Sequence, residues 1–428
     1  MKRILGYIAI LLGSTLSVIE TAGAQSLTIE TCYDLANANY PLVQQYELIA
    51  RSRDYSIENA QKAYLPQVGV YGQATYQSDV TRIPIELPGL VIPQLPKDQY
   101  KAYGDISYSL TDLVTTKNTT DLVKAQAAID AKKVDVELYA LRDRVNALFF
   151  GILLIDAQIE QSALVQKDIQ TGINKVEVAI ANGTALKSTA DNLKAELLNA
   201  RQRTTELRAT RSGYAQMLSL FIGEPVQEGT VLVKPAPAVV PQTIHRPEVA
   251  LFTLQQDALA LQHRHVVNQQ LPRVSLFFQG GLGRPALDMF NTNAEPYYVT
   301  GVRLQWNLSG FYSFRNRMRQ ITDNQRSTQV QKETFLFNTN LTLRRQNAEI
   351  AKAMALMADD DGIIELRERV KQTVQTQLEL GTATTNDYII AVNAEDQARK
   401  NRILHEIQML MAQYNARTTT GEEITTQE

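Results

Sequence analysis

The chain has 428 residues, 44% of them hydrophobic and 21% charged, with 43 Lys and Arg against 45 Asp and Glu. This balance gives no basic footprint, which argues against nucleic acid as the main partner. The single cysteine, Cys32, excludes an intramolecular disulfide framework and a cysteine-based zinc cluster, and is expected to be a small apolar core residue. Because no catalytic arrangement is recognisable, we expect no enzyme, no cofactor and no metal.

The N-terminal segment 1–24 has the pattern of a secretory signal peptide. Lys2 and Arg3 form a short basic segment, residues 4–18 are apolar, and residues 22–24 (Ala-Gly-Ala) match the pattern that signal peptidase cleaves. The mature chain is therefore expected to begin at Gln25. The alternative is a membrane anchor, which needs an apolar run of about 20 residues. No later run is long enough, so we expect no transmembrane helix in the mature chain.

Two halves of the chain share motifs in the same order. A Leu-Pro-x-Val motif at 65–68 recurs 206 residues later at 271–274, and a Gly-Thr-Ala motif at 183–185 recurs 198 residues later at 381–383. Register shared over about 170 residues indicates a tandem repeat. The predicted organisation is a signal peptide (1–24), a first repeat (25–221), a proline-rich linker (222–246), a second repeat (247–417) and a polar tail (418–428).

Each half is expected to contain a helix, two strands and a long helical hairpin. Apolar residues recur at alternating spacings of three and four along 131–159, a heptad pattern typical of helices that pack lengthwise. One helix over 117–181 would be about 100 Å long at about 1.5 Å per residue. In the second half a thinner row continues, and residues 359–362 (Asp-Asp-Asp-Gly) are predicted to interrupt the helix as a solvated charge cluster. An isolated fibrous coiled coil is the alternative, which the intervening strands disfavour.

The predicted strands alternate apolar with polar residues, as segments 68–77 and 302–308 illustrate. This alternation fits a transmembrane β-barrel, with lipid outside and water inside, and equally a half-buried soluble sheet. Four such strands cannot close a barrel, and an open edge is not tolerated in lipid, so several chains would have to share one barrel. The residues predicted to face lipid are Val68, Val70, Val302, Leu304 and Trp306. A proline-rich loop at 82–96 is expected at the outer mouth.

Residues 27–36 (Leu-Thr-Ile-Glu-Thr-Cys-Tyr-Asp-Leu-Ala), followed by Asn-Tyr-Pro at 39–41, resemble the mature start of TolC-like outer membrane efflux proteins. The Leu-Pro-x-Val motifs, the heptad helices and the Gly-Thr-Ala turns resemble the same family. The resemblance covers essentially the whole mature chain. It implies a mixed α and β fold, in which a homotrimer forms one 12-stranded transmembrane β-barrel, four strands per chain, continued by a long α-helical coiled-coil barrel in the periplasm.

The resemblance also implies a function. The chain would be a passive exit duct in the outer membrane of a Gram-negative bacterium, in a tripartite efflux or type I secretion system. It would dock a periplasmic adaptor protein, and through it an inner-membrane transporter. From the residues alone, a soluble periplasmic coiled-coil scaffold or binding protein is the alternative. The adaptor-docking residues implied are those of the two hairpin turns: Gly183, Thr184, Ala185, Gly381, Thr382 and Ala383. Glycine permits the left-handed turn that ends a helix, and Ser or Thr can cap the next helix.

In the resembled family, aspartates of the second hairpin ring the closed periplasmic entrance. Asp387 matches the first aspartate, whereas Ile390 stands at the second and Ala383 at the latch arginine. The carboxylate expected in the first hairpin is replaced by Thr189. The resemblance therefore implies at most one acidic ring, formed by Asp387, and no salt-bridge latch. The alternative is that Asp387 only stabilises the first turn of its helix through the helix dipole.

Overall fold

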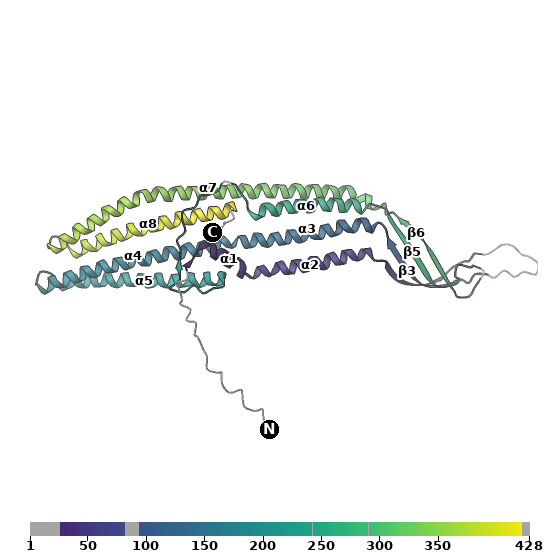
Figure 1. Cartoon of the computed structure of the whole chain (residues 1–428), viewed down its shortest axis with the longest axis horizontal. Coiled ribbons are helices and arrows are strands. Elements are labelled where there is room, and N and C mark those ends of the chain that lie inside the picture. The colour runs from purple at the N-terminus through teal and green to yellow at the C-terminus, as the bar shows by residue number, and fades with distance from the viewer. Residues whose placement is uncertain (1–25, 82–93, 242, 290, 422–428) are drawn as a thin grey trace, which may run out of the picture. The chain divides into compact units, whose positions relative to one another are not determined.

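The computed structural model describes residues 26–81, 94–241, 243–289 and 291–421 (Figure 1). The predicted signal peptide, most of the proline-rich loop at 82–96 and the end of the polar tail lie outside these residues. The described chain forms two compact units, each built from three separate segments. The hairpin unit comprises residues 26–36, 145–237 and 355–410, and the sheet unit comprises the described residues of 37–144, 238–354 and 411–421.

The sheet unit contains a four-stranded antiparallel sheet in the order β2-β3-β5-β6. Its strands are β2 (Gln67–Tyr76), β3 (Asp98–Ser109), β5 (Arg273–Arg284) and β6 (Glu295–Gln305). The predicted strand at 68–77 is confirmed to within one residue. The predicted strand segment 302–308 belongs to β6 only as far as Gln305, and Trp306 lies one residue beyond it. Within the described residues, β2 and β6 each have one edge that no strand pairs with.

Four helices of the sheet unit follow one another in the same order as the strands (Figure 1). They are α2 (Gln44–Gln61), α3 (Asp112–Tyr139), α6 (Pro247–Asn268) and the first part of α7 (Gly310–Glu379). The side chains of α2 pack on α3, and those of α3 pack on α6. Between α6 and α7, Gln256 Nε2 donates to the carbonyl of Gln325 at 2.8 Å. Short 3-10 turns, Pro41–Val43 and Lys62–Tyr64, flank α2.

The hairpin unit is built from α1 (Ile29–Asn39), α4 (Leu141–Ala181), α5 (Lys187–Ile222), the last part of α7 and most of α8 (Thr385–Thr420). A short parallel pair, β1 (Ser26–Leu27) and β4 (Val231–Leu232), joins its first segment to the chain that follows α5. Its core contains the following apolar side chains of α4, α5 and α8: Val165, Ile169, Ile173, Val176, Leu193, Leu197, Tyr388 and Val392.

Cys32 lies in α1 and is fully buried, as predicted for a core residue. Burial, reinforced by the nearby Glu30 carboxylate, raises the pKa of its thiol to about 12. The thiolate is the nucleophilic form of cysteine, so Cys32 is chemically inert at neutral pH.

A buried arginine fixes the start of the linker in the hairpin unit. Arg211 of α5 is 6% exposed and forms an ion pair with Asp156 of α4. Its guanidinium also donates to the carbonyls of Gln227 (3.3 Å) and Thr230 (3.2 Å), just before β4. These bonds satisfy carbonyls of an irregular segment, which would otherwise need water or secondary structure.

The heptad row of the first half is confirmed, because its members are buried at Val134, Leu138, Leu141, Val145, Ile152 and Ile155. The single helix expected over 117–181 is wrong in detail. The helix begins earlier, at Asp112, and a turn at Ala140 separates α3 from α4. The N–H of Ala140 still donates to the carbonyl of Val136 at 3.2 Å, so the backbone bonding is loosened there without being lost.

The interruption expected at residues 359–362 is also wrong, because α7 runs through them without a break. Asp360 is 6% exposed, and its carboxylate lies 2.7 Å from Nδ1 of His405 on α8. Asp361 pairs with Arg402, which also lies on α8. Partners on a neighbouring helix, which a charge run does not disclose, therefore stabilise this segment as helix.

The segment 112–181 is long and apolar enough to meet the length and composition criteria of a membrane helix. Its most apolar stretch is 44% buried, and Phe149, Phe150 and Ile152 of α4 are almost completely covered. The core helix of a folded protein meets the same criteria, so the expected absence of a transmembrane helix stays a prediction.

Candidate functional site

The sheet has one apolar and one polar face. Strand register places Val68, Ile106 and Phe278 in one row across the sheet, and Gly69, Asp105 and Gln279 in the next. Successive residues of a strand point to opposite faces, so these rows belong to different sides. The apolar side carries the following exposed residues: Val68, Val70, Tyr76, Tyr100, Ile106, Leu276, Phe278, Leu282, Tyr298, Val302 and Leu304.

The predicted lipid-facing residues of the strands lie together on this apolar side. Val68, Val70, Val302 and Leu304 are 67–86% exposed in the single chain. Trp306 lies beyond the strand, and its indole Nε1 donates to the carbonyl of Gln270 at 3.0 Å. A contiguous apolar surface of this size marks a place where lipid or another protein covers the chain.

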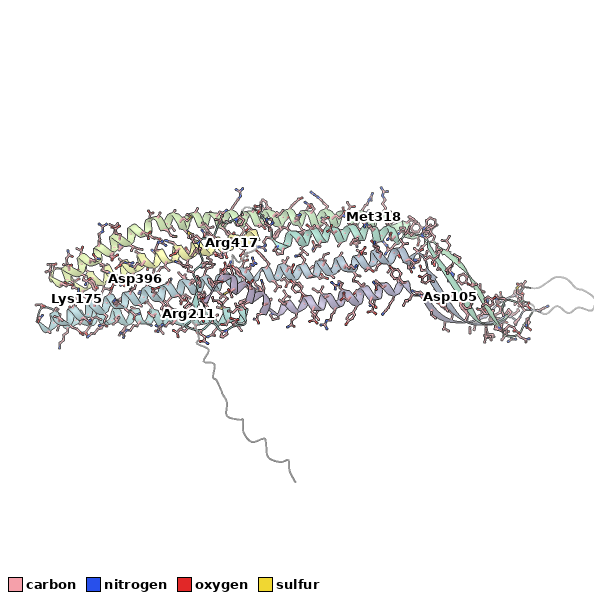
Figure 2. The ribbon with its side chains drawn as sticks, in the orientation of Figure 1. Asp105, Lys175, Arg211, Met318, Asp396 and Arg417 are labelled. Atoms are coloured by element: carbon pink, nitrogen blue, oxygen red, sulfur yellow. The ribbon has the colours of Figure 1, made fainter. Side chains whose placement is uncertain are left out.

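The polar side holds a connected group of side chains around Asp105, which Figure 2 labels on the sheet. Asp105 is 8% exposed and accepts a hydrogen bond from Gln279 Nε2 at 2.5 Å. An Arg303 nitrogen lies 3.8 Å from the same carboxylate, and its guanidinium stands 4.5 Å above the Phe277 ring. These charged groups compensate each other, and the Arg303 side chain is 46% exposed, so this side is suited to water.

The first tip, residues 182–186, joins α4 to α5. Gly183 has a φ of 75°, and its N–H donates to the carbonyl of Ile180 at 3.0 Å. The N–H of Thr184 donates to the carbonyl of Ala179 at 2.9 Å, and its hydroxyl donates to the same oxygen at 3.0 Å. This pair of backbone bonds is the Schellman motif, which favours glycine at the left-handed position.

The second tip, residues 380–384, joins α7 to α8 through the same bonds. Gly381 has a φ of 74°, and its N–H donates to the carbonyl of Leu378 at 3.1 Å. Thr382 donates to the carbonyl of Gln377 through its N–H (2.9 Å) and its hydroxyl (3.1 Å). The glycine requirement predicted for both turns is therefore confirmed.

The two tips differ in how the next helix begins. Thr384 and Asp387 form a capping box: the Thr384 N–H donates to Asp387 Oδ2 at 2.9 Å, and the Asp387 N–H donates to Thr384 Oγ1 at 3.2 Å. At the first tip Leu186 stands at the cap position and makes no side-chain bond. Capping by Ser or Thr is thus confirmed for the second tip and wrong for the first.

Asp387 makes the bonds of a helix-capping residue. Hydrogen bonds from the hydroxyl and the backbone N–H of Thr384 hold the pKa of its carboxyl below the usual range. Its position in an acidic ring at an entrance stays a prediction.

Both tips present side chains to solvent. Gly183, Thr184, Gly381 and Thr382 are exposed, while Ala185 and Ala383 are half-buried. Beside them Leu186 and Leu380 are each 74% exposed. Each tip therefore exposes one leucine side chain, a small apolar contact surface, next to a backbone that the Schellman hydrogen bonds hold.

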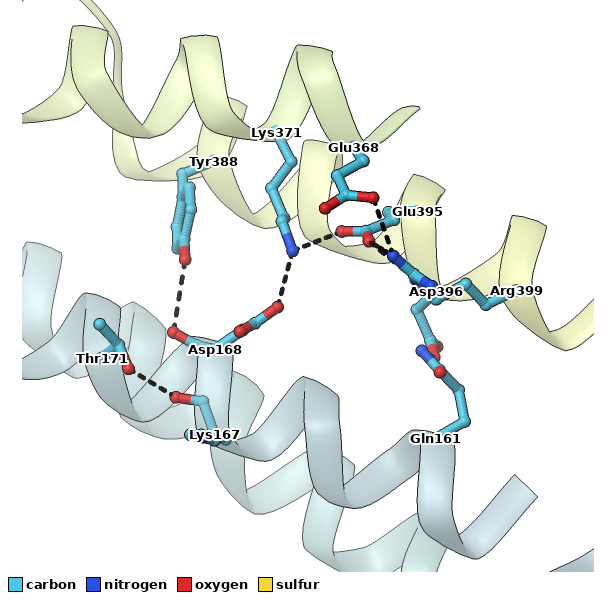
Figure 3. A network of polar contacts seen from close by, with 10 residues as sticks. All are labelled: Gln161, Lys167, Asp168, Thr171, Glu368, Lys371, Tyr388, Glu395, Asp396 and Arg399. Atoms are coloured by element: carbon cyan, nitrogen blue, oxygen red, sulfur yellow. Dashed lines mark hydrogen bonds and ion pairs between the residues drawn. The ribbon is translucent and has the colours of Figure 1, made fainter. Parts of the chain in front are cut away.

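A buried polar network joins three helices of the hairpin unit (Figure 3). Lys371 of α7 lies 2.8 Å from Asp168 of α4 and 2.5 Å from Glu395 of α8. Arg399 binds the other oxygen of Glu395 at 2.7 Å and also contacts Glu368. The Glu395 and Lys371 side chains are only 6% and 14% exposed.

The two central groups of this network stay charged despite their burial. Burial opposes ionisation of Lys371, but its bonds to Asp168 and Glu395 outweigh that effect and raise its pKa. Burial likewise opposes the Glu395 carboxylate, and Lys371 and Arg399 outweigh it, so the pKa of Glu395 is lowered.

Sequence reasoning missed this network. Its members come from helices far apart in the chain, as the 203 residues between Asp168 and Lys371 illustrate. One signal was present: Glu395 lies on the same helix face as Tyr388 and Val392, which are 2% and 3% exposed. A carboxylate aligned with core residues has to find a partner.

Among the residues that the structure describes, no three His, Cys, Asp or Glu side chains gather into a metal-binding group. No protein-family model and no curated protein matches the chain in sequence.

Solved structures do match. CusC superposes with a TM-score of 0.69 at 12% identity, over 92% of each chain. Its structures are described as concerning the conformational changes that accompany folding and transmembrane channel formation. The outer membrane protein VceC of Vibrio cholerae gives 0.64 at 11% identity, over 91% of this chain and 96% of VceC. The outer membrane channel MtrE of Neisseria gonorrhoeae, in its open state, gives 0.65 at 12% identity, over 92% and 88%. The chain therefore has the fold of these outer membrane channel proteins, the fold expected from its resemblance to the TolC-like family.

Proposed function

We propose that this chain is an exit duct in the outer membrane of a Gram-negative bacterium, through which substrates pass passively. The observation that carries the proposal is the four-stranded sheet, whose two faces suit lipid and water. Its fold likeness to outer membrane channels supports the same conclusion. These relatives are channels, which agrees with the absence of a recognisable catalytic arrangement in the sequence.

The duct is a homotrimer. Backbone groups at a free strand edge cannot be left unpaired in hydrocarbon, so β2 and β6 need partners there. Three copies supply an even-numbered, closed barrel of 12 strands, wide enough for an aqueous lumen. The same order of helix, two strands and long helices on both sides of the linker supports the two-repeat organisation and a near-regular ring.

The two tips dock a periplasmic adaptor, and through it an inner-membrane transporter. Their matching Schellman turns give each chain two similar contact points, and a trimer would present six. Individually weak contacts then combine by multivalency. Asp387 stands beside the second tip, where three copies of its carboxylate would give the entrance a negative potential that favours cations.

Membrane fractionation tests the duct. The chain should require detergent for extraction and run as a heat-sensitive oligomer three times the mass of one chain. A monomer in the soluble periplasmic extract would instead support the alternative, a soluble coiled-coil scaffold.

A double substitution, Thr184→Lys with Thr382→Lys, tests the docking role. Each change replaces a small exposed side chain with a long charged one, and each removes one hydroxyl bond to a helix carbonyl. We expect drug export to be lost while the heat-sensitive trimer still forms in the membrane. Lys187→Glu, a charge change just past the first tip, serves as the control. Unchanged drug susceptibility in the double variant would count against docking at the tips.

A further inference from the structure

The exposed face of α7 nearest the sheet carries a regular row of arginines, named here the basic row. Arg315, Arg319 and Arg326 are exposed, at spacings of four and seven residues, and so share one helix face. The opposite face packs on the unit's own core, where Ile321 and Thr328 are 4% and 9% exposed. Helix α6, which bonds to this part of α7, lies on the buried side rather than against the basic row.

A matching row of carboxylates lies on α2, at the other end of the helix series. Glu47, Asp54 and Glu58 have side chains 75%, 63% and 66% exposed. Their spacings are seven and four residues, the same as those of the basic row. We name this set the acidic row. Its neighbours Leu48 and Tyr55 are 55% and 64% exposed, so apolar surface is exposed on this helix as well.

Along the chain, the two rows lie at nearly equal separations from the sheet, with a constant difference of one residue. The basic row lies 10, 14 and 21 residues after the last residue of β6. The acidic row lies 9, 13 and 20 residues before the first residue of β2. Since α7 leaves the sheet and α2 enters it, the helices would be antiparallel when placed side by side. Glu58, Asp54 and Glu47 would then face Arg315, Arg319 and Arg326 in that order.

An equivalent helix pair already exists within the chain. Helix α3 leaves β3 and α6 enters β5, the next strand of the sheet. Thr115 and Thr119 of α3 follow soon after β3, which ends at Ser109. They line one cleft with His265 of α6, which lies shortly before the start of β5 at Arg273. Similar separations from the sheet along the chain therefore bring residues of adjacent helices together.

Existing pairings leave both rows available. Glu47 lies 3.6 Å from Arg51, Glu58 lies 3.4 Å from Lys62, and Asp54 pairs with its neighbour Arg53. In the basic row, Arg326 lies 4.0 Å from Glu333 of its own helix. All are exposed pairs between residues close together in the chain, and such pairs contribute little to stability. Carboxylates of this kind can exchange a local partner for an arginine that binds them in a fork geometry.

We propose that the basic row of one copy docks on the acidic row of a second copy of this chain. The inference rests on the proposed function, since it names the side chains that join the copies beneath the barrel. It is a head-to-tail contact, so it extends from copy to copy until a ring closes. The two rows also fix the register of the two helices, because sliding one helix by one turn along the other leaves arginines and carboxylates of the rows without their partners.

Cross-linking between single cysteines tests the docking in intact membranes. The pair Asp54→Cys and Arg319→Cys is placed in one chain and treated with a bismaleimide. The native Cys32 is buried with a raised pKa and does not compete. We expect covalent dimers and trimers on a denaturing gel, and neither from the single variants. In the control, Arg317→Cys replaces Arg319→Cys, because Arg317 lies on the α6 side, 3.1 Å from Gln269.

Each outcome is decisive. Cross-linked trimers from the Arg319 pair, and few from the Arg317 pair, support the inference. A heat-sensitive oligomer in the membrane that stays uncross-linked, or cross-links equally with Arg317→Cys, overturns the inference and leaves the duct standing. A product whose mass is no multiple of the chain assigns the row to another protein and also overturns it. Recovery of the chain as a soluble monomer overturns the proposed function itself.

A charge reversal provides an independent measure. Arg319→Asp should lower the temperature at which the oligomer dissociates, and adding Asp54→Arg should restore most of the loss. Failure of the second change to restore any stability would contradict a direct pairing of the two rows.

Discussion

Replacing Lys371 with methionine should loosen the hairpin unit locally by about 2 kcal/mol. Lys371 bridges Asp168 and Glu395, and the Glu395 side chain is only 6% exposed. Removing the sole partner of a buried charge costs about 3–5 kcal/mol, and one charged hydrogen bond contributes about 1.5–3 kcal/mol. Because Arg399 continues to bind Glu395 in the variant, we expect a loss of stability near the lower of these two ranges, about 2 kcal/mol. Methionine keeps the length and apolar stem of lysine, so packing is largely preserved.

Hydrogen exchange of peptides from α4 and α8 measures this opening. A loss of about 2 kcal/mol corresponds to roughly a 30-fold rise in exchange, since each 1.4 kcal/mol is tenfold. Lys175→Met is the matched control: Lys175 also pairs between α4 and α7, with Glu379, but the two side chains are 43% and 46% exposed. Exposed pairs contribute about 0–1 kcal/mol, so little change is expected there. Equal exchange in the two variants would refute the reasoning.

The same experiment has a defined pH dependence. The pKa of Glu395 is lowered from 4.5, so its contribution is complete above that value and is lost as the pH falls through the folded-state pKa. The pKa of Lys371 is raised from 10.5, so its contribution is complete below that value and is lost as the pH rises through the folded-state pKa. Protection should therefore form a plateau between about pH 5 and pH 10. In Lys371→Met, protection from exchange on the plateau should be lower, and the loss of protection on the acid side should be smaller.

Two further predictions concern the entrance and the sheet. In planar-bilayer conductance, Asp387→Asn should weaken both the preference for cations and the block by multivalent cations. The control Asp191→Asn, near the first tip, should change neither property. Unaltered selectivity in Asp387→Asn would leave Asp387 with its capping role alone. Gly281→Ala should impair assembly of the heat-sensitive oligomer, because the added Cβ would lie 2.2 Å from the carbonyl of Ala102 and 2.6 Å from Cα of Tyr103. Gly72→Ala on the same sheet meets nothing within 4 Å and should assemble normally.

Patterns with a fixed period were predictable from the sequence. The alternation around Val68 and Val70 defines a strand face, because the side-chain period of a strand is two. The heptad row through Val145 and Ile152 defines a buried helix stripe for a similar reason. Gly183 and Gly381 were predictable as turns, because their φ values of 75° and 74° suit glycine best.

Features that depend on partners distant in sequence were not predictable in this way. Asp360 belonged to an acidic run that indicated a solvated break, yet His405 on another helix binds it. Lys371 carries no local sign of its two carboxylate partners. Leu186 stands at the cap position of α5 and makes no side-chain bond, so the local capping rule failed at the first tip although it held at the second.

Among the described residues, β2 and β6 each leave one edge unpaired, which has a consequence for how the protein reaches its final state. A single copy entering the bilayer would carry unsatisfied backbone groups on both sides of its sheet, each costing several kcal/mol in hydrocarbon. In the proposed trimeric duct, insertion and association would therefore be one event, whose rate should rise more steeply than in proportion to the amount of chain delivered. At low expression the protein would accumulate as a periplasmic intermediate, and stability would have meaning only at a stated chain concentration.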